Sequence, residues 1–534
     1  MRDTTGVWSG VGALLADPET PFTARMIRLP GLLAVALLLM SCGGGGTGAG
    51  TTSSTPSTPV TPVTPAGPTW TPGVYLPYSS FAAQCAVPRS GNNPQSGQPW
   101  PDRQGSVAAE NHWLRAWTHD LYLWFDEVAD RDPAATATTA AFFDLEKTTA
   151  TLASGQARDR FHFTYDTATW LALSQSGVQA GYGIEWGVLA SRPPRKVVVQ
   201  YTEAASPAAL ATPAIGRGAE VVTVDGVDVV NDNTTAGVNT INAGLFPTAA
   251  GQAHTLTIRD RGATGTRAVS LRSASVTKNP VPLARVIDTG AGRVGYLLFN
   301  DHLATAEKAL VDAVNALKAG AAQDLVLDIR YNGGGYLDIA NELAYMIAGP
   351  TQTAGHTFER IQFNSQHPAT DPVTGQALPS LDLPRVFVLT TPDTCSASES
   401  VINSLRGIGL QVIQVGGTTC GKPYGFYPAD NCGTTYFSIQ FRGVNDVGFG
   451  DYAEGFSATR TTPPTLANLP GCGTPDDYAH DLGDVAEGQL AAALQYRVTS
   501  SCPVVSGPEL APALAGGLPL QPAREPWRSN RVLR

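Results

Sequence analysis

The stretch "GRVGYLLFNDHLATAEKALVDAVNALKAGAAQDLVLDIRYNGGGYL", residues 292–337, decides the fold of this 534-residue chain. It opens with a β-type apolar run, passes into a helical pattern with apolar residues every three or four positions, and returns to an apolar run that ends in three glycines. A strand, a helix and a second strand in this order predict a β-α-β unit with parallel strands. The alternation continues with apolar runs at residues 385–391 and 411–417 around a helical pattern at 398–409. We therefore expect an α/β domain over residues 277–502.

The region upstream of the α/β domain begins with a helical pattern. In "AENHWLRAWTHDLYLWFDEV", the large apolar side chains of Trp113, Trp117, Leu121 and Trp124 follow one another at spacings of three and four. This spacing predicts one apolar stripe on an amphipathic helix. We expect residues 75–175 to form a mainly helical N-terminal domain.

Residues 176–276 change to short β-rich runs separated by Gly, Pro and Asp turns. Within them, "SPAALATPAIGRGAEVVTVDGVDV" at residues 206–229 resembles the centre of a PDZ domain, and any small β-barrel is the alternative. On the PDZ resemblance, the backbone N–H groups of the loop "GYGIEW" would hold the C-terminal carboxylate of a peptide, and the next strand would pair with that peptide by β-augmentation. The loop residues with this expected role are Gly181, Tyr182, Gly183 and Ile184.

The sequence near the N-terminus has the layout of a bacterial secretion signal. Residues 26–42, "MIRLPGLLAVALLLMSC", combine a basic start, an apolar run and a final cysteine. The ending resembles a lipobox, in which Cys42 would become the lipidated first residue of the mature protein. We interpret residues 1–42 as the signal region, with Met26 as a candidate start. Gly43 follows the cysteine in place of aspartate, which favours the outer membrane and leaves the side of that membrane open.

Composition indicates the character of the remaining segments and argues against some classes of partner. Residues 43–74 are rich in Gly, Ser, Thr and Pro and predict a flexible tether, and residues 503–534 predict a disordered tail. The chain has 35 basic and 45 acidic residues, a net charge of −10, and no basic run. This charge pattern argues against nucleic acid as a partner. With no apolar stretch of 18 residues, the sequence predicts no membrane-spanning helix, so the expected membrane contact is the lipid anchor alone.

Six cysteines follow the lipobox, an even number that predicts disulfides in an exported chain. They are Cys85, Cys395, Cys420, Cys432, Cys472 and Cys502. The sequence allows every pairing, and we favour Cys420 with Cys432 because that pair closes a short loop. No Cys-x-x-Cys or Cys/His spacing indicates zinc. We expect no metal and no organic cofactor.

The segment "DTCSASES", residues 393–400, places three serines directly after an apolar run. A serine nucleophile needs a base, and a desolvated lysine can serve because it loses its proton where arginine cannot. Only six of the 35 basic residues are lysines, and Lys422 stands in the glycine-rich turn "GGTTCGKPYGF", 26 positions after Ser396. Among the histidines only His302 follows a strand, and no Gly-x-Ser-x-Gly elbow occurs. The Ser-x-x-Lys match at residues 275–278 precedes no buried helix, and we assign it no role.

Three motifs in order carry a family resemblance: "DIRYNGGG" at 328–335, "SASE" at 396–399 and "GTTCGKPYGF" at 417–426. Together they resemble the C-terminal processing peptidases, or tail-specific proteases, which are serine–lysine peptidases with a PDZ domain. The order of a helical N-terminal segment, a PDZ-like β domain and an α/β catalytic domain also matches. The resemblance covers about residues 110–490 and implies a multidomain α+β fold of the tail-specific protease type.

The resemblance implies a role for five residues of the candidate site. Ser396 would be the nucleophile and Lys422 its general base. The oxyanion hole would use the backbone N–H of Ala397, at a helix N-terminus, and that of Gly334 or Gly335, where the backbone must approach the substrate closely.

Several residues around this site depart from the family pattern or extend it. The serine–lysine spacing is one residue longer than is typical, and Phe426 stands where many members have a glutamine that orients the lysine. Ser398 is the second choice for the nucleophile and is otherwise expected to cap the helix. Cys395 and Cys420 both neighbour the site, and a disulfide there could fix its geometry.

The sequence therefore predicts an exported, lipid-anchored serine endopeptidase that acts on proteins or peptides with free C-termini. Two alternatives remain open, a non-catalytic binding protein on the same fold and an envelope scaffold that works through its PDZ-like domain. The missing glutamine favours the binding protein, and the intact serine–lysine pair favours the enzyme. The sequence leaves the oligomeric state open.

Overall fold

In the computed structural model, the unit predicted for residues 292–337 is formed by β13 (Gly292–Leu298), α5 (Ala306–Ala319) and β14 (Asp324–Asp328). The two strands are parallel neighbours. Both faces of β14 are buried, which explains why its apolar run is continuous instead of alternating. The unit belongs to a seven-stranded sheet with the order β12-β13-β14-β17-β18-β24-β23, in which only β12 is antiparallel to its neighbour.

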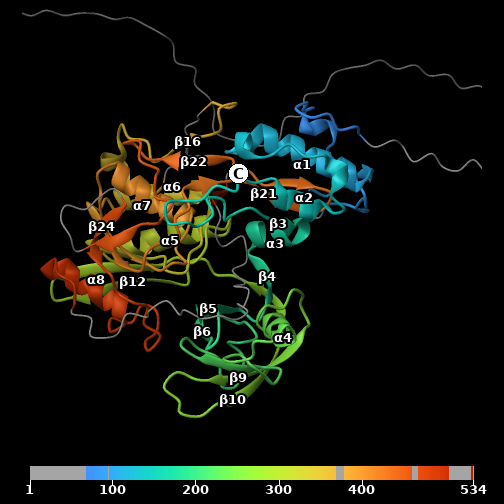
Figure 1. The fold of residues 1–534 in the computed structure, drawn as a ribbon. Helices are drawn as coiled ribbons and strands as arrows, with labels where there is room; N and C mark the ends of the chain where they lie inside the picture. Colours follow the sequence, from blue (N-terminus) through green and yellow to red (C-terminus); the bar gives the residue numbers. More distant parts are fainter. Residues whose placement is uncertain (1–67, 94–95, 369–377, 460–466, 504–530, 533–534) are drawn as a thin grey trace, which may run out of the picture. The chain divides into compact units, whose positions relative to one another are not determined.

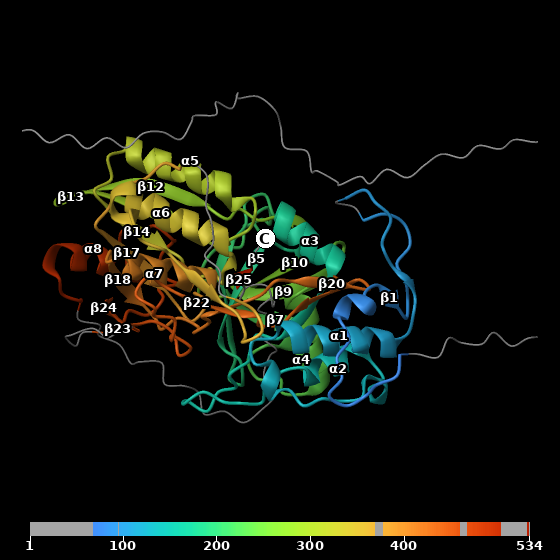
Figure 2. The same cartoon turned by 90° about the horizontal axis from the view of Figure 1, so that it is seen from above.

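Helices cover both faces of this sheet (Figures 1 and 2). One face packs against α5, α6 and α7 through a large apolar cluster, and the other packs against α8 through a second cluster. The remaining elements of these layers are β12 (Leu283–Thr289), α6 (Leu337–Thr353), β17 (Arg385–Thr390), α7 (Ala397–Gly407), β18 (Gln411–Gly416), β23 (Ser457–Thr459), β24 (Asn468–Cys472) and α8 (Gly488–Thr499).

The carboxyl ends of three neighbouring parallel strands carry the three motifs that the sequence singled out. The glycine run follows β14, the segment "DTCSASES" follows β17, and the turn that contains Lys422 follows β18. Because β14, β17 and β18 are adjacent and parallel, these three segments emerge at the same edge of the sheet. Open α/β sheets bind their ligands at this edge.

The structure describes residues 68–93, 96–368, 378–459, 467–503 and 531–532, all within one compact unit, Pro65–Arg534. The predicted signal region with Cys42, most of the tether and most of the predicted tail lie outside the described residues. Among the residues that are described, no helix combines the length and the apolar character needed to cross a membrane.

Small sheets surround the main one. They have the orders β16-β22-β19, β20-β21-β3 and β15-β25. Their strands are β3 (Phe163–Asp166), β15 (Gly335–Tyr336), β16 (Arg360–Gln362), β19 (Tyr424–Gly425), β20 (Ala429–Asn431), β21 (Thr434–Phe437), β22 (Phe441–Val444) and β25 (Arg531–Val532).

The N-terminal region contains the predicted apolar stripe, but its helix is shorter than expected. Ser106 caps α1 (Val107–Leu121) by accepting the Ala109 N–H, and the buried rings of Trp113 and Trp117 stack with their centroids 5.2 Å apart. The helix ends before Trp124, which instead packs against Tyr424. The prediction that Trp124 continues the stripe was therefore wrong.

Tyr122 explains why α1 ends where it does. Its backbone turns to an extended conformation, and its buried hydroxyl donates to Asp159 at 2.7 Å. This tertiary contact outweighs the local helical pattern.

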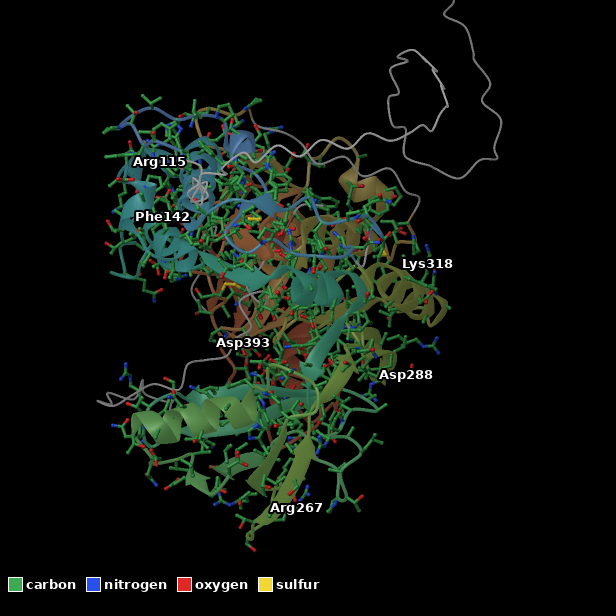
Figure 3. The ribbon with its side chains drawn as sticks, turned by 90° about the vertical axis from the view of Figure 1, so that its right-hand side faces the viewer. Arg115, Phe142, Arg267, Asp288, Lys318 and Asp393 are labelled. Atoms are coloured by element: carbon green, nitrogen blue, oxygen red, sulfur yellow. A yellow bond between two sulfur atoms is a disulfide. The ribbon has the colours of Figure 1, made fainter. Side chains whose placement is uncertain are left out.

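The N-terminal region also contributes to the edge of the α/β region. Strand β3 pairs with β21, and α1 packs on Tyr436 of β21 through Trp113 and Trp117. The other elements of this region are η1 (Tyr78–Ser80), β1 (Gln84–Cys85), β2 (Arg103–Gln104), η2 (Phe125–Glu127), η3 (Pro133–Ala135), α2 (Thr139–Leu145) and α3 (Thr167–Ser176). Figure 3 labels Arg115 of α1 and Phe142 of α2.

Residues 178–277 form a six-stranded sheet, one helix and a separate strand pair. The sheet has the order β10-β9-β7-β6-β5 with β8 paired to β7, and β4 pairs with β11. An apolar cluster of its own lies between the sheet and α4. The elements are β4 (Val178–Gly181), β5 (Ile184–Ala190), β6 (Lys196–Thr202), β7 (Glu220–Val224), β8 (Val227–Asp228), α4 (Thr235–Leu245), β9 (Ala253–Arg259), β10 (Arg267–Arg272) and β11 (Ala274–Thr277).

Candidate active site

Ser396 stands at the sharp turn between β17 and α7. Its backbone has φ 61° and ψ −112°, a conformation that non-glycine residues rarely adopt and that costs about 1–3 kcal/mol. The residue is fully buried, and its Oγ makes no hydrogen bond within the described part of the chain. The fold therefore holds a strained serine, with a hydroxyl that no protein group occupies, at the carboxyl edge of the sheet.

Lys422 lies in the turn after β18 and is also fully buried. Its Nζ lies over the ring of Phe426 at 3.9 Å and over the ring of Phe161 at 4.8 Å from the ring centroids. The ring of Phe426 thus occupies the neighbourhood in which the family pattern predicts a carboxamide. Aromatic faces attract a cation, whereas burial disfavours one.

Glu399 joins the two segments, and the sequence reasoning assigned it no role. One carboxylate oxygen, Oε2, accepts the backbone N–H of Ser396 at 2.9 Å and that of Lys422 at 2.8 Å. The other, Oε1, accepts the Gly421 N–H at 2.8 Å and the Thr419 hydroxyl. The structure therefore brings the backbones of the predicted nucleophile and base to a single oxygen atom.

Burial of the Glu399 carboxyl raises its pKa, while hydrogen bonds from Thr419, Lys422, Ser396 and Gly421 act in the opposite direction. Four donors around one carboxyl favour its ionised form, which only accepts hydrogen bonds. A signal for this residue was present in the sequence, because an acid three positions after a serine at a helix start is the capping-box pattern.

A disulfide between Cys395 and Cys420 links the same two segments, since Cys395 precedes Ser396 and Cys420 lies two positions before Lys422. The Cys420 N–H also donates to the carbonyl of Thr394 at 3.0 Å. The expectation that a disulfide forms beside the site is confirmed. The favoured pairing of Cys420 with Cys432 was wrong.

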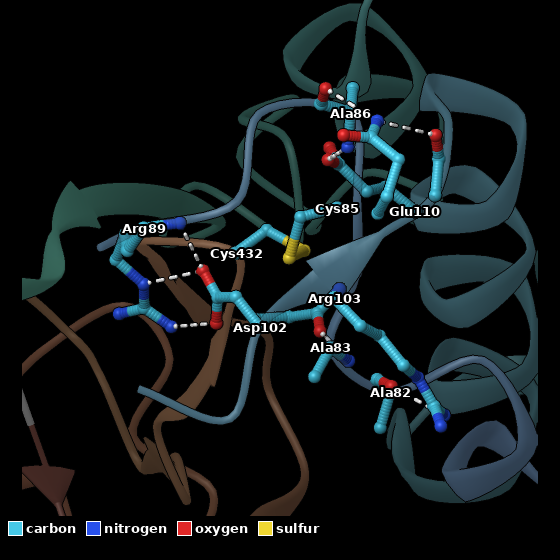
Figure 4. Close-up of a disulfide and its surroundings, with 12 residues drawn as sticks. Ala82, Ala83, Cys85, Ala86, Arg89, Asp102, Arg103, Glu110 and Cys432 are labelled. Carbon is cyan, nitrogen blue, oxygen red and sulfur yellow. Dashed lines mark hydrogen bonds and ion pairs between the residues drawn. A yellow bond between two sulfur atoms is a disulfide. The ribbon is translucent and has the colours of Figure 1, made fainter. Parts of the chain in front are cut away.

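Three disulfides occur in the described part of the chain: Cys85–Cys432, Cys395–Cys420 and Cys472–Cys502. Cys432 occupies the turn between β20 and β21, where it faces β1 of the N-terminal region (Figure 4). Tertiary position and not loop length thus selects its partner. An ion pair between Arg89 and Asp102 and a hydrogen bond from the Ala86 N–H to Glu110 surround this disulfide.

Two groups of side chains bring sulfur and carboxylate atoms close enough to suggest a metal site. They are Cys85, Glu110 and Cys432, and Cys395, Glu399 and Cys420. Zinc and related ions bind the thiolate form of cysteine, and a cysteine in a disulfide has no thiolate to offer. Neither group fits a metal.

The glycine run after β14 contains the two candidate N–H groups of Gly334 and Gly335, which differ in their surroundings. The Gly334 N–H donates to Asn332 Oδ1 at 3.0 Å and is therefore occupied. Gly335 has φ 137°, and a Cβ there would lie 2.4 Å from the carbonyl oxygen of His302, so only glycine fits. Across the site, Ala397 is the first residue of α7, and its N–H has no acceptor inside the helix. Of the three predicted oxyanion donors, Gly334 is therefore the one whose N–H already donates to a side chain.

Asn332 supports both sides of the site and was not singled out from the sequence. Its backbone carbonyl accepts the Cys395 N–H at 3.0 Å and the Ser398 hydroxyl at 2.9 Å. Ser398 is the second residue of α7, and the capping position belongs to Ser396. The predicted capping role of Ser398 was therefore wrong, because the strained turn places the helix start two residues earlier.

His302, the alternative base, forms its hydrogen bond with Asn332. Its Nδ1 lies 3.0 Å from Asn332 Oδ1, and burial lowers the pKa of the imidazole to about 3 against the opposing effect of that hydrogen bond. Within the described residues no hydrogen bond joins His302 to Ser396. The imidazole is a buried neutral group, and the backbone of His302 pairs with the glycine run.

A buried ionic network lies at the carboxyl end of β14. Arg330 is fully buried and pairs with Asp328, Glu487 and Asp476 at 2.8–2.9 Å. Asp476 also pairs with Arg217 of the six-stranded β region at 2.7 Å. Burial opposes the ionisation of Asp476, but the two arginines outweigh it and hold the pKa of this carboxyl below its ordinary value. The network ties the β region to the strand that ends at the glycine run.

The contact between the two regions continues beside the nucleophile. The side-chain amide of Gln200 on β6 donates to the Asp393 carboxylate at 2.9 Å, three residues before Ser396. Figure 3 labels Asp393, which lies on the part of the α/β region that faces the six-stranded sheet.

A groove in the β region collects all four residues predicted to bind a carboxylate. Its wall contains residues 179–186 from β4, the following loop and the start of β5, and residues 245–247 at the end of α4. Lys278 of the discarded Ser-x-x-Lys match also lines this groove. Its Nζ lies 3.5 Å from Asp301 and 3.9 Å from Glu185.

Comparison with known proteins shows which family part of this chain resembles. Residues 293–425 match the family described as Peptidase family S41. The matched stretch includes both Ser396 and Lys422. The resemblance to C-terminal processing peptidases is confirmed, and the matched residues lie within the α/β region predicted at residues 277–502.

Two individual proteins are also similar to this chain. The chain is 28% identical over 258 residues to the carboxyl-terminal-processing protease of Picosynechococcus sp. strain PCC 7002, covering 47% of this chain and 56% of that protein. A crystal structure of a candidate S41 protease from Bacteroides fragilis NCTC 9343 superposes with a TM-score of 0.55 at 21% identity, covering 75% of this chain and all of that one. The second likeness shows the shared mixed α+β fold.

Proposed function

We propose that this protein is a serine endopeptidase that cleaves polypeptides recognised through their C-terminal tails. The observation that carries the proposal is the convergence of the Ser396 and Lys422 backbones on one oxygen of Glu399. A strained serine with an unoccupied hydroxyl and a buried lysine, held to each other by a carboxylate and a disulfide, are the parts of a serine–lysine dyad.

In the proposed reaction, Lys422 in its neutral form takes the proton of the Ser396 hydroxyl while Oγ attacks the carbonyl carbon of the scissile bond. A lysine amine removed from water gives up its proton more readily than an exposed one. The N–H groups of Ala397 and Gly335 would hold the developing oxyanion. Lys422 would then protonate the leaving amine, and a water molecule activated by the same amine would hydrolyse the acyl-enzyme.

The groove of the β region is the proposed recognition site for the substrate tail. A PDZ-like domain would hold the terminal carboxylate on the N–H groups of the loop at residues 181–184 and pair the tail with β5. The strand, loop and helix end that line the groove are the three parts that such binding needs. The ionic contact between Arg217 and Asp476 would keep this groove oriented toward the catalytic edge.

We propose that the protein acts in the bacterial cell envelope, exported and anchored by lipid on Cys42. The sequence of the signal region supports this location. So do three disulfides, which persist in oxidising compartments.

The test compares four forms of the chain from residue 65 onward, the part that forms one compact unit: wild type, Ser396→Ala, Lys422→Ala and the control Lys308→Ala, whose side chain is exposed. Each is incubated with an unfolded protein that has a free C-terminus, and products are identified by mass spectrometry. We expect cleavage by wild type and Lys308→Ala only. Cleavage by all four would refute the dyad, and tail binding without cleavage by any would favour a non-catalytic binding protein.

A further inference from the structure

The strand β25 (Arg531–Val532) comes from a distant part of the sequence and lies at the candidate active site. It pairs in parallel with β15, matching Arg531 with Gly335 and Val532 with Tyr336. It also lies beside β19, the two-residue strand that begins two positions after Lys422. The two-residue strand β25 thus contacts both the strand that begins in the glycine run and the strand that follows Lys422.

The hydrogen bonds of β15 show which edge β25 covers. On one edge, the His302 N–H donates to the Gly334 carbonyl at 3.1 Å, and the Tyr336 N–H donates to the His302 carbonyl at 2.9 Å. Backbone groups of successive residues in a strand point to opposite edges. The N–H and carbonyl of Gly335 therefore point to the other edge, on which β25 pairs.

This edge is the one that catalysis would use. The Gly334 N–H is occupied by Asn332, which leaves the Gly335 N–H as the oxyanion donor from the glycine run. A substrate whose scissile carbonyl reaches that N–H must lie along the same edge of β15. An extended backbone added there would receive main-chain hydrogen bonds without any requirement on its side chains.

We propose that the segment at Arg531–Val532 is a resident, intramolecular occupant of the substrate site and that it competes with substrates for the edge of β15. The proposal rests on the proposed function for its effect on catalysis, while the docking of the segment stands on the strand pairing alone. The ligand class of the edge is an extended polypeptide backbone.

The size of the expected effect follows from the covalent connection between the segment and its own site. A segment joined to its own site has an effective concentration on the order of 1 mM. If the segment by itself bound with a Kd of about 0.1–1 mM, it would raise the apparent KM for substrate about two- to tenfold. This effect is large enough to measure and small enough for a good substrate to overcome.

Three variants test the proposal in the chain from residue 65 onward. One ends after Pro503, which keeps the disulfide between Cys472 and Cys502. The second is Val532→Pro, which removes a backbone N–H from β25 and disfavours its pairing. The control is Val532→Thr, which keeps both the N–H and the β-branched shape. We expect kcat/KM to rise about two- to tenfold for the first two, mainly through KM, with the control unchanged. Equal values for all forms would overturn the proposal.

A second measurement does not depend on catalysis. Hydrogen exchange of the Gly335 amide should be faster after truncation and in Val532→Pro than in wild type, because the covering strand is gone. The Tyr336 amide donates to the His302 carbonyl on the opposite edge and serves as the internal reference. Unchanged exchange would overturn the proposal, whether or not the forms are active. Inactivity of every form would by itself refute only the proposed function. Removal of the segment from wild type but not from Ser396→Ala, seen in the intact mass, would also overturn it, because the segment would then be a substrate.

Discussion

Replacement of Glu399 by glutamine tests the central feature of the site. Hydrogen bonds to a charged group contribute about 1.5–3 kcal/mol each. The carboxylate accepts four, from Thr419 and Gly421 on one oxygen and from Ser396 and Lys422 on the other. Glutamine has one acceptor oxygen, so two of the four are lost and an amide N–H₂ faces their donors.

The loss of two such bonds corresponds to about 3–6 kcal/mol. The neutral amide also removes the cost of burying a charge, the effect that raises the pKa of the Glu399 carboxyl. The two effects oppose each other, so we expect the lower value, about 3 kcal/mol of unfolding free energy. Because the lost bonds set the relative positions of Ser396 and Lys422, we also expect kcat/KM to fall about 10–100-fold.

Urea unfolding followed by tryptophan fluorescence at pH 7 measures the first quantity, and cleavage of an unfolded protein without urea measures the second. The matched control is Glu359→Gln. Glu359 is also buried, and its carboxylate accepts the hydroxyl of Ser400, a residue of α7 like Glu399, at 2.7 Å. The control should lose stability and keep its kcat/KM. If Glu399→Gln unfolded within about 0.5 kcal/mol of wild type and cleaved at the same rate, the reasoning would be refuted.

Three further perturbations follow from the same region. Burial holds the pKa of His302 at about 3, below its unfolded value of about 6.5, so the stability of the neutral imidazole is present above pH 6.5 and is lost as the pH falls toward 3. Between pH 7 and pH 4.5, wild type should lose about 2.5 kcal/mol more than His302→Gln in urea titrations, and parallel losses would contradict this pKa. Replacing Cys395 and Cys420 together by alanine opens a link with a sequence separation of 25 residues and should cost about 3 kcal/mol together with much of the activity, whereas unchanged values would show that the disulfide leaves the site geometry unaffected. Phe426→Leu removes an aromatic face 3.9 Å from Lys422 Nζ and should shift the pH profile of kcat, and an unshifted profile would show that the ring does not influence the amine.

Much of the α/β region could be predicted because its signals are local. Continuous apolar runs such as that of β14 mark strands buried on both faces, and a helical pattern between two such runs makes the strands parallel. Parallel neighbours end at the same edge of the sheet. Ser396 after β17 and Lys422 after β18 could therefore be placed near each other without coordinates. The same local reasoning failed at Trp124, where the buried hydroxyl of Tyr122 ended the helix early.

The sequence by itself determined the order of strands and helices, the family resemblance of the α/β domain and the placement of a serine and a lysine at its edge, because each depends on side-chain type and spacing along the chain. Only the tertiary structure decided which groups hold that pair. Glu399 also binds the backbone N–H groups of Gly421 and Lys422, and since nearly every residue has such a group, no pattern marks these two partners. The pairing of Cys85 with Cys432 requires Cα atoms 5.3 Å apart, a distance set by packing across 347 residues. The strand at Arg531–Val532 likewise finds β15 through an open backbone edge, which exists only once the chain has folded.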